Sequence, residues 1–286
     1  MASCLENKRY QMMKVKEGEY VPDVEDTFPE DDPFVHKLAY DFIYEDDIDE
    51  NYPYLDDSWS WKRGHLWALF REHFICKWFN PLYYGMRFKG RENIKKFKKE
   101  LGNGAVTVCN HAYRWDFISV WHATGRLRVW YPAWGENFRT KDRDDMRYSC
   151  GIPVPTGMNA LKKFNEAFDK LHEQGEWIHV FPEECRWNNY KPLRPFRKGA
   201  FTFAYKYKLP ILPMVITYRP RTGIYKFFNK TEPLYTLHVG EPVFPNFELS
   251  RKESVEELRD RVHRIMVQMA GIEENPWPSV LPNDKG

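Results

Sequence analysis

The chain has 286 residues and a formal net charge of +2, which is enough length for one main domain with a substantial core. Its five cysteines form no C-x-x-C pair, which argues against a structural zinc site and favours a reducing compartment. The first residues are polar and charged, without the apolar run of a signal peptide, so we expect a cytoplasmic protein.

Charge is distributed unevenly along the chain. Residues 1–57 carry 5 Lys and Arg against 17 Asp and Glu, a net charge of −12, whereas residues 58–286 carry 38 against 24, a net charge of +14. We expect the acidic lead, residues 1–57, to be partly disordered, with docking of the lead on the basic body as the alternative. A basic body suits phosphates, a nucleotide tail or an acidic membrane surface. We do not expect nucleic acid as a partner, because no recognised binding module appears.

The next segment, residues 58–84, has the pattern of an amphipathic helix. Its centre, residues 66–79, is too short and too often charged to span a bilayer. At helical spacing the apolar side comprises Leu66, Leu69, Phe70, Phe74 and Trp78, and Arg71, Glu72 and Lys77 point away from it. Such a helix can pack on the core or lie in a membrane interface, and the sequence leaves both open.

Residues 85–271 alternate between helix and strand patterns. Predicted helices cover 91–104, the segment opening at 116, 159–173, the region of 201–204, and a closing helix between a Ser250 capping box and Gly271. Predicted strands cover 105–109, 128–132, 177–181, the second half of 209–217, and 234–239. This alternation predicts a single α/β domain over 85–271, with a mostly parallel central sheet flanked by helices. A tail, residues 272–286, follows.

A His and an Asp lie five positions apart where the first of these strands ends. Asn110 breaks the strand, His111 follows on the loop, and Asp116 opens the next helix, where the helix dipole favours a carboxylate. A histidine bonded to Asp116 through one ring nitrogen would present the other nitrogen as a base. The pair His36 and Asp41 has the same spacing but no strand before it, so spacing alone does not decide which pair is functional.

The predicted sheet supplies the missing context. In open α/β sheets, ligands bind beyond the carboxyl ends of the strands. Two strands end in polar loops there, one leading to His111 and the other to Glu183. We therefore expect His111 and Glu183 to share one rim of the sheet and His36 to lie elsewhere.

Four ordered blocks resemble a known family. They are Asn110-His111-x4-Asp116, Gly151-Ile-Pro-Val-Pro155, Val180-Phe-Pro-Glu183-x2-Arg186 and Leu209-Pro-Ile-Leu-Pro-Met214. Together, over roughly residues 85 to 270, they look like the PlsC-like glycerolipid acyltransferases, of the 1-acylglycerol-3-phosphate acyltransferase type.

The resemblance implies acyl transfer from acyl-CoA or acyl-carrier protein to a hydroxyl of a lysophospholipid, with no cofactor and no metal. It makes His111 the general base and Asp116 its orienter. Backbone N–H groups after Cys109 or Val180 are candidate donors to the oxyanion. The residues matching the acceptor-binding block, or following it closely, are Glu183, Arg186, Arg194, Arg197 and Lys198. Peripheral attachment to the inner face of the cytoplasmic membrane is the expected location.

The chain departs from the family pattern at three positions. Glu184-Cys185 stands where the family usually has Gly-Thr, Thr156 replaces an Arg, and Tyr113 replaces a frequent Ser. The catalytic pair is intact, but the phosphate-binding residues are fewer. A larger head group or another lipid alcohol therefore stays open as the acceptor. Non-catalytic lipid binding and metal-dependent phosphate-ester hydrolysis are the rival functions.

Overall fold

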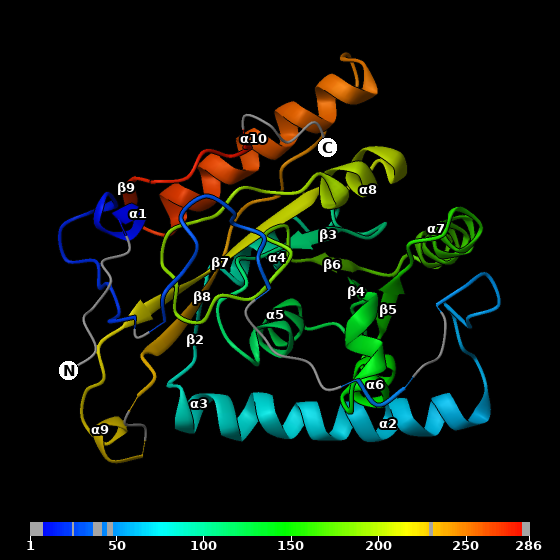
Figure 1. The fold of residues 1–286 in the computed structure, drawn as a ribbon, viewed down its shortest axis with the longest axis horizontal. Coiled ribbons are helices and arrows are strands. Elements are labelled where there is room, and N and C mark those ends of the chain that lie inside the picture. The colour runs from blue at the N-terminus through cyan, green and yellow to red at the C-terminus, as the bar shows by residue number, and fades with distance from the viewer. Residues whose placement is uncertain (1–7, 25, 37–41, 45–47, 229–230, 282–286) are drawn as a thin grey trace.

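The computed structural model describes residues 8–24, 26–36, 42–44, 48–228 and 231–281. Its main sheet has five strands in the order β2-β8-β7-β3-β6 (Figure 1). The strands are β2 (Arg87–Lys89), β3 (Val106–Val108), β6 (Ile178–Val180), β7 (Ile211–Arg219) and β8 (Leu234–Val239). Three neighbouring pairs are parallel, and only β7 and β8 are antiparallel. The prediction of a mostly parallel α/β sheet is confirmed.

Helices cover both faces of this sheet. One face packs against α8 (Gly199–Tyr207) and α10 (Arg251–Met269), and α5 (Asp116–Thr124) lies on the other (Figure 1). The central strand β7 is buried along eight of its nine residues, as expected of a strand covered on both faces. Its alternate side chains enter separate core clusters, with Ile211 and Val215 on one face and Leu212 and Met214 on the other.

The remaining elements extend the sheet and its edges. A parallel pair of strands, β4 (Tyr131–Trp134) and β5 (Gly151–Val154), continues beside β6 through a bridge between Trp130 and Ile178. The short strands β1 (Lys14–Val15) and β9 (Ile272–Glu274) pair in antiparallel fashion. Besides the helical rod described below, the remaining helices of the described residues are α1 (Lys8–Gln11), α4 (Glu92–Lys96), η2 (Gly135–Arg139), α6 (Arg143–Tyr148), α7 (Met158–Glu173) and α9 (Tyr225–Phe228).

Most predicted elements occur where the sequence placed them, and two differ. The helix expected over residues 91–104 ends at Lys96, because Phe97 leaves helical geometry at φ −102° and ψ 30° and turns follow. The strand expected at 128–132 begins its ladder with β5 at Tyr131, and Trp130 before it forms the isolated bridge to Ile178.

The predicted amphipathic helix forms one long rod along the lower side of Figure 1. It consists of α2 (Trp59–Phe74), a π-helical turn η1 (Ile75–Phe79) and α3 (Asn80–Tyr83). Its apolar side faces solvent, since Leu66, Phe70, Phe74 and Trp78 are 57 to 70% exposed. Glu72 lies away from this apolar side, as expected, and is only 3% exposed. The side of the helix that carries Glu72 packs on the body, where the Ser149 hydroxyl donates a hydrogen bond to the Glu72 carboxylate.

Described parts of the acidic lead contact the body. The Lys191 ammonium donates to the Glu19 carboxylate at 3.1 Å, and Arg147 pairs with Asp56 at 2.9 Å. Phe28 is buried against Trp187. These contacts agree with the alternative in which the lead docks on the basic body.

Candidate active site

The predicted His–Asp pair is assembled at the carboxyl end of β3. The Nδ1 atom of His111 lies 2.7 Å from Oδ2 of Asp116. The same Oδ2 accepts the backbone N–H groups of Ala112 and Tyr113, and Oδ1 accepts that of Phe117 at 2.8 Å. Because Asp116 is 1% exposed and accepts four hydrogen bonds, its position is fixed. With Nδ1–H bonded to Asp116, Nε2 is the nitrogen that can accept a proton.

Two side chains fix the loop that carries His111. Asn110 is buried and pairs with the backbone of Ile216 in β7, accepting its N–H at 2.7 Å and donating to its carbonyl at 3.1 Å. Glu183, at the end of the neighbouring strand, accepts the backbone N–H of His111 at 3.0 Å. His111 and Glu183 therefore share the expected rim.

The ring of His111 packs against aromatic side chains. It stacks on Phe181 with centroids 4.0 Å apart, and Phe181 meets the ring of His179 edge-on. Burial lowers the pKa of His179 to about 3, so this second histidine is neutral beneath the site. His111 itself keeps 21% of its side chain exposed.

Two arginines lie near the catalytic loop. Among the described residues, Arg186 forms no ion pair or hydrogen bond, so its guanidinium is available to a ligand. Burial raises the pKa of Tyr84 to about 12, and the charges of Arg114 and Arg186 act in the opposite direction. Arg114 is exposed on the His111 loop. Sequence reasoning missed Arg114, although it lies inside the His-x4-Asp motif.

The other predicted acceptor-binding residues are placed differently. Arg197 donates to the Glu184 carboxylate at 2.9 Å and lies 3.7 Å from the ring centroid of Phe34. Lys198 is exposed at the start of α8. Glu183 is 3% exposed and bonded within the protein, so its carboxylate is already engaged.

One expectation about location is wrong. His36 was expected to lie away from the rim, but it stacks on Trp134 at the carboxyl end of β4, with centroids 4.3 Å apart. Burial lowers the pKa of His36, and the charges of Glu184, His111 and Arg194 are near enough to affect it. The lead brings His36 there by a long-range contact that spacing does not encode. Its predicted partner Asp41 lies outside the described residues.

The amides after Cys109 are largely engaged. Those of His111, Ala112 and Tyr113 donate to carboxylates, and that of Glu184 donates to the Phe181 carbonyl. These bonds hold the two loops in register. The role of a loop amide as an oxyanion donor stays a prediction.

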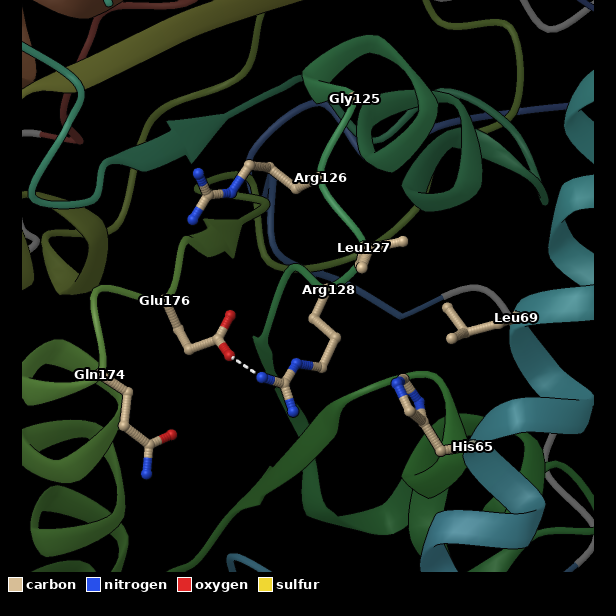
Figure 2. Close-up of a pocket in the computed structure, with 8 residues that line it drawn as sticks. All are labelled: His65, Leu69, Gly125, Arg126, Leu127, Arg128, Gln174 and Glu176. Atoms are coloured by element: carbon tan, nitrogen blue, oxygen red, sulfur yellow. Dashed lines mark ion pairs between the residues drawn. The ribbon is translucent and has the colours of Figure 1, made fainter. Parts of the chain in front are cut away.

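A cavity of about 560 Å³ lies at the opposite edge of the sheet (Figure 2). It is bordered by α2, by the loop after α5 and by the residues that precede β6, and an ion pair between Arg128 and Glu176 crosses it. None of the predicted site residues lines it. In the described part of the chain, no cluster of three or more His, Cys, Asp or Glu side chains could hold a metal ion.

Comparisons with known proteins find acyltransferases. Residues 85–217 match the family model described as Acyltransferase. An uncharacterized acyltransferase of Schizosaccharomyces pombe is 26% identical over 217 residues, covering 65% of this chain and 68% of that protein. The 1-acyl-sn-glycerol-3-phosphate acyltransferase of Haemophilus influenzae is 24% identical over 149 residues, covering 49% of this chain and 59% of that protein. Among solved structures, the chain is similar to the LPA acyltransferase PlsC of Thermotoga maritima, with a TM-score of 0.48, 23% identity, and coverage of 76% of this chain and 85% of that one.

Proposed function

We propose that the chain, whose residues 85–217 match the Acyltransferase family model, is an O-acyltransferase of the PlsC-like kind that esterifies a lysophospholipid hydroxyl with a fatty acyl group from an acyl thioester. Acyl-CoA or acyl-carrier protein is the donor, and no further cofactor takes part. The observation that carries the proposal is the 2.7 Å contact between Nδ1 of His111 and the buried Asp116, in a histidine that keeps 21% of its side chain exposed.

The proposed reaction proceeds in one displacement. Nε2 of His111 takes the proton of the acceptor hydroxyl while its oxygen bonds to the thioester carbonyl carbon. The tetrahedral intermediate collapses, the carbon–sulfur bond breaks, and the leaving thiolate takes the proton from His111, which returns the imidazole to its neutral form. Asp116 holds the imidazole in the required tautomer and stabilises the imidazolium. A positioned base of this kind contributes on the order of 10² to 10⁴ in rate.

The basic residues at the rim suit a phosphate on the acceptor. Arg186 has no partner among the described residues, and a guanidinium can bind a phosphate through two parallel hydrogen bonds. Arg114, exposed on the loop that carries His111, adds a second positive charge to this part of the protein. Arg197 is partly neutralised by Glu184, which weakens this side of the site. Lysophosphatidic acid or a related lysophospholipid is therefore the proposed acceptor.

The test is thiol release from a long-chain acyl-CoA with a panel of lysophospholipids. We expect release that depends on the acceptor and falls on the order of 10²-fold or more in His111→Ala. His172→Ala, on α7 and away from the rim, is the control and should keep wild-type rates. Release that is independent of the acceptor, or equal in the two variants, refutes the proposal.

The same function requires access to lipid, and the exposed apolar side of α2 suits a membrane surface. Beside α3, Phe227 in α9 is 81% exposed and Ile224, which precedes α9, is 60% exposed, and the Tyr225 hydroxyl donates to the carbonyl of Pro81 in α3. Both elements lie along the lower side of Figure 1. The basic residues Lys62, Arg63, Lys77 and Lys226 are exposed on these elements. Aromatic and cationic side chains together favour a helix that lies in the interface.

We expect peripheral attachment to the inner face of the cytoplasmic membrane. Within the described ranges, no helix is both long and apolar enough to cross a bilayer. The protein should co-sediment with anionic liposomes at low salt, and Phe70→Glu with Phe74→Glu should abolish this. Met158→Glu, at an 82% exposed apolar position on α7, is the matched control and should still sediment. Wild-type protein that stays in the supernatant would exclude attachment through this face.

A further inference from the structure

Arg194 is the most deeply buried arginine beside the active site. It is 1% exposed, and every hydrogen bond that its guanidinium makes in the described structure is internal. One arm, Nη2, donates to the Glu183 carboxylate at 3.1 Å and to the Cys185 carbonyl. The other arm, Nη1, donates to the Pro33 carbonyl at 2.7 Å and to the Cys185 sulfur at 3.0 Å. Such an arginine cannot reach a substrate phosphate without leaving these partners.

The Glu183 carboxylate connects Arg194 to the loop that carries His111. Its Oε1 accepts the backbone N–H of Arg194 at 2.8 Å, and its Oε2 accepts both the Arg194 guanidinium and the backbone N–H of His111. Removing the cationic partner of a buried ion pair leaves the carboxylate as an uncompensated buried charge, which is strongly destabilising. The amide of the catalytic histidine is therefore held by an ion pair that Arg194 completes.

The second arm of Arg194 reaches the acidic lead. The carbonyl of Val35 accepts hydrogen bonds from the Cys185 thiol at 3.2 Å and from the Trp187 indole at 3.1 Å. The Arg194 guanidinium lies 4.4 Å from the centroid of the Trp187 ring. The lead at Pro33 and Val35 is thus fixed to the same loop that fixes His111.

We propose that Arg194 is a positioning residue for the proposed acyl transfer, linking the lead at Pro33 to the backbone of His111 through Glu183. This inference rests on the proposed function only in naming the reaction. The link itself is a chain of hydrogen bonds that can be observed without substrate. It also gives the pair Glu183 and Arg194 a role that does not involve touching the acceptor.

The test compares Arg194→Met with Lys191→Met. Lys191 lies on the same loop, has a side chain that is 2% exposed, and pairs with Glu19 of the lead, but has no contact with Glu183. Both variants should unfold at lower temperature. Only Arg194→Met should lower kcat, on the order of 10- to 100-fold, with KM little changed, because a small displacement of a base costs rate rather than binding.

The second readout is the backbone amide of His111 in protein labelled with ¹⁵N-histidine. Its proton resonance should move upfield in Arg194→Met as the bond to Glu183 weakens, and should not move in Lys191→Met. If Arg194→Met does not fold, Arg194→Lys replaces it, because a single ammonium cannot serve both arms and should give intermediate shifts and rates. An unmoved amide, or a kcat equal to that of the Lys191 variant, would overturn the proposal. A wild-type protein without acyl transfer would refute the proposed function and leave the amide test intact.

Discussion

The Asp116 carboxylate binds both the His111 ring and the backbone of the loop that carries it. Its Oδ2 accepts from the His111 ring and from two loop amides, while Oδ1 accepts the N–H of Phe117 at the start of α5. The same carboxylate thus orients the His111 ring and shapes the loop. An amide side chain has a single acceptor oxygen, so it cannot keep all four bonds.

Asp116→Asn should lower kcat on the order of 10² to 10⁴ while KM for the donor stays within a few-fold, because the ring loses its orienter rather than its substrate contacts. Thiol release under saturating donor and acceptor measures this loss. A variant within about 10-fold of wild type would mean that Asp116 is not needed to orient the base.

Glu184 adopts a backbone conformation that favours glycine. Its φ is +68°, in the left-handed region, and the family pattern usually has Gly at this position. The left-handed conformation costs a residue with a Cβ roughly 1 to 2 kcal/mol. The chain tolerates this cost while placing a carboxylate against Arg197.

Glu184→Gly and Glu184→Ala separate the charge of Glu184 from its backbone strain. Both variants should lower KM for a phosphate-bearing acceptor, since Arg197 loses its carboxylate partner. The Gly variant should be about 1 kcal/mol more stable than the Ala variant in urea unfolding, because only Ala keeps the strained backbone. Equal stability of the two variants would contradict the assignment of strain.

The sequence predicts the local part of this site well and the distant part poorly. Asn110, His111 and Asp116 belong to one short segment, so their meeting follows from a strand, a loop and a helix start. The position of His36 on the rim depends on how the lead folds back across the sheet. No local pattern carries that information.

At the scale of elements, α2 is held to the body through a buried acid. Burial raises the pKa of Glu72 from its ordinary value of 4.5 to about 7, and the Ser149 hydroxyl acts in the opposite direction. A raised carboxyl pKa means that the folded state binds more protons than the unfolded state between these two values. The stabilisation is therefore complete below about pH 4.5 and is lost as the pH rises to about 7.

Glu72→Gln should remove this dependence, because the amide is neutral at every pH. Urea unfolding at pH 5 and pH 8 should show wild type losing stability relative to the variant by up to about 3 kcal/mol, at about 1.4 kcal/mol per pKa unit. Parallel pH curves for the two proteins would show that Glu72 is not protonated in the fold.

The helical spacing of apolar residues in α2 could be predicted from the sequence, but which side of the helix packs on the body could not. Its apolar row follows directly from the spacing of Leu66, Phe70 and Phe74. The opposite side packs on the body through Trp61, whose indole donates to the Arg147 carbonyl, and through Glu72. Those partners belong to α6 and the residue that follows it, and a single helix pattern does not reveal them.

For the whole molecule, alternating strands and helices predicted the mostly parallel sheet correctly. The strand order could not be predicted, because sequence order does not give spatial neighbours. The antiparallel placement of β8 beside β7 is the clearest example. The charge asymmetry pointed toward the observed contacts between the lead and the body, but not to their position beside His111.

Acyl transfer to a lysolipid hydroxyl with His111 as the base is tested most directly by following the labelled acyl group. With ¹⁴C-labelled acyl-CoA and lysophosphatidic acid, we expect label to enter a diacylated lipid at one ester per thiol released, and we expect His111→Ala to abolish both the label transfer and the thiol release. Label recovered as free fatty acid, or diacylated product formed equally by His111→Ala, would contradict it.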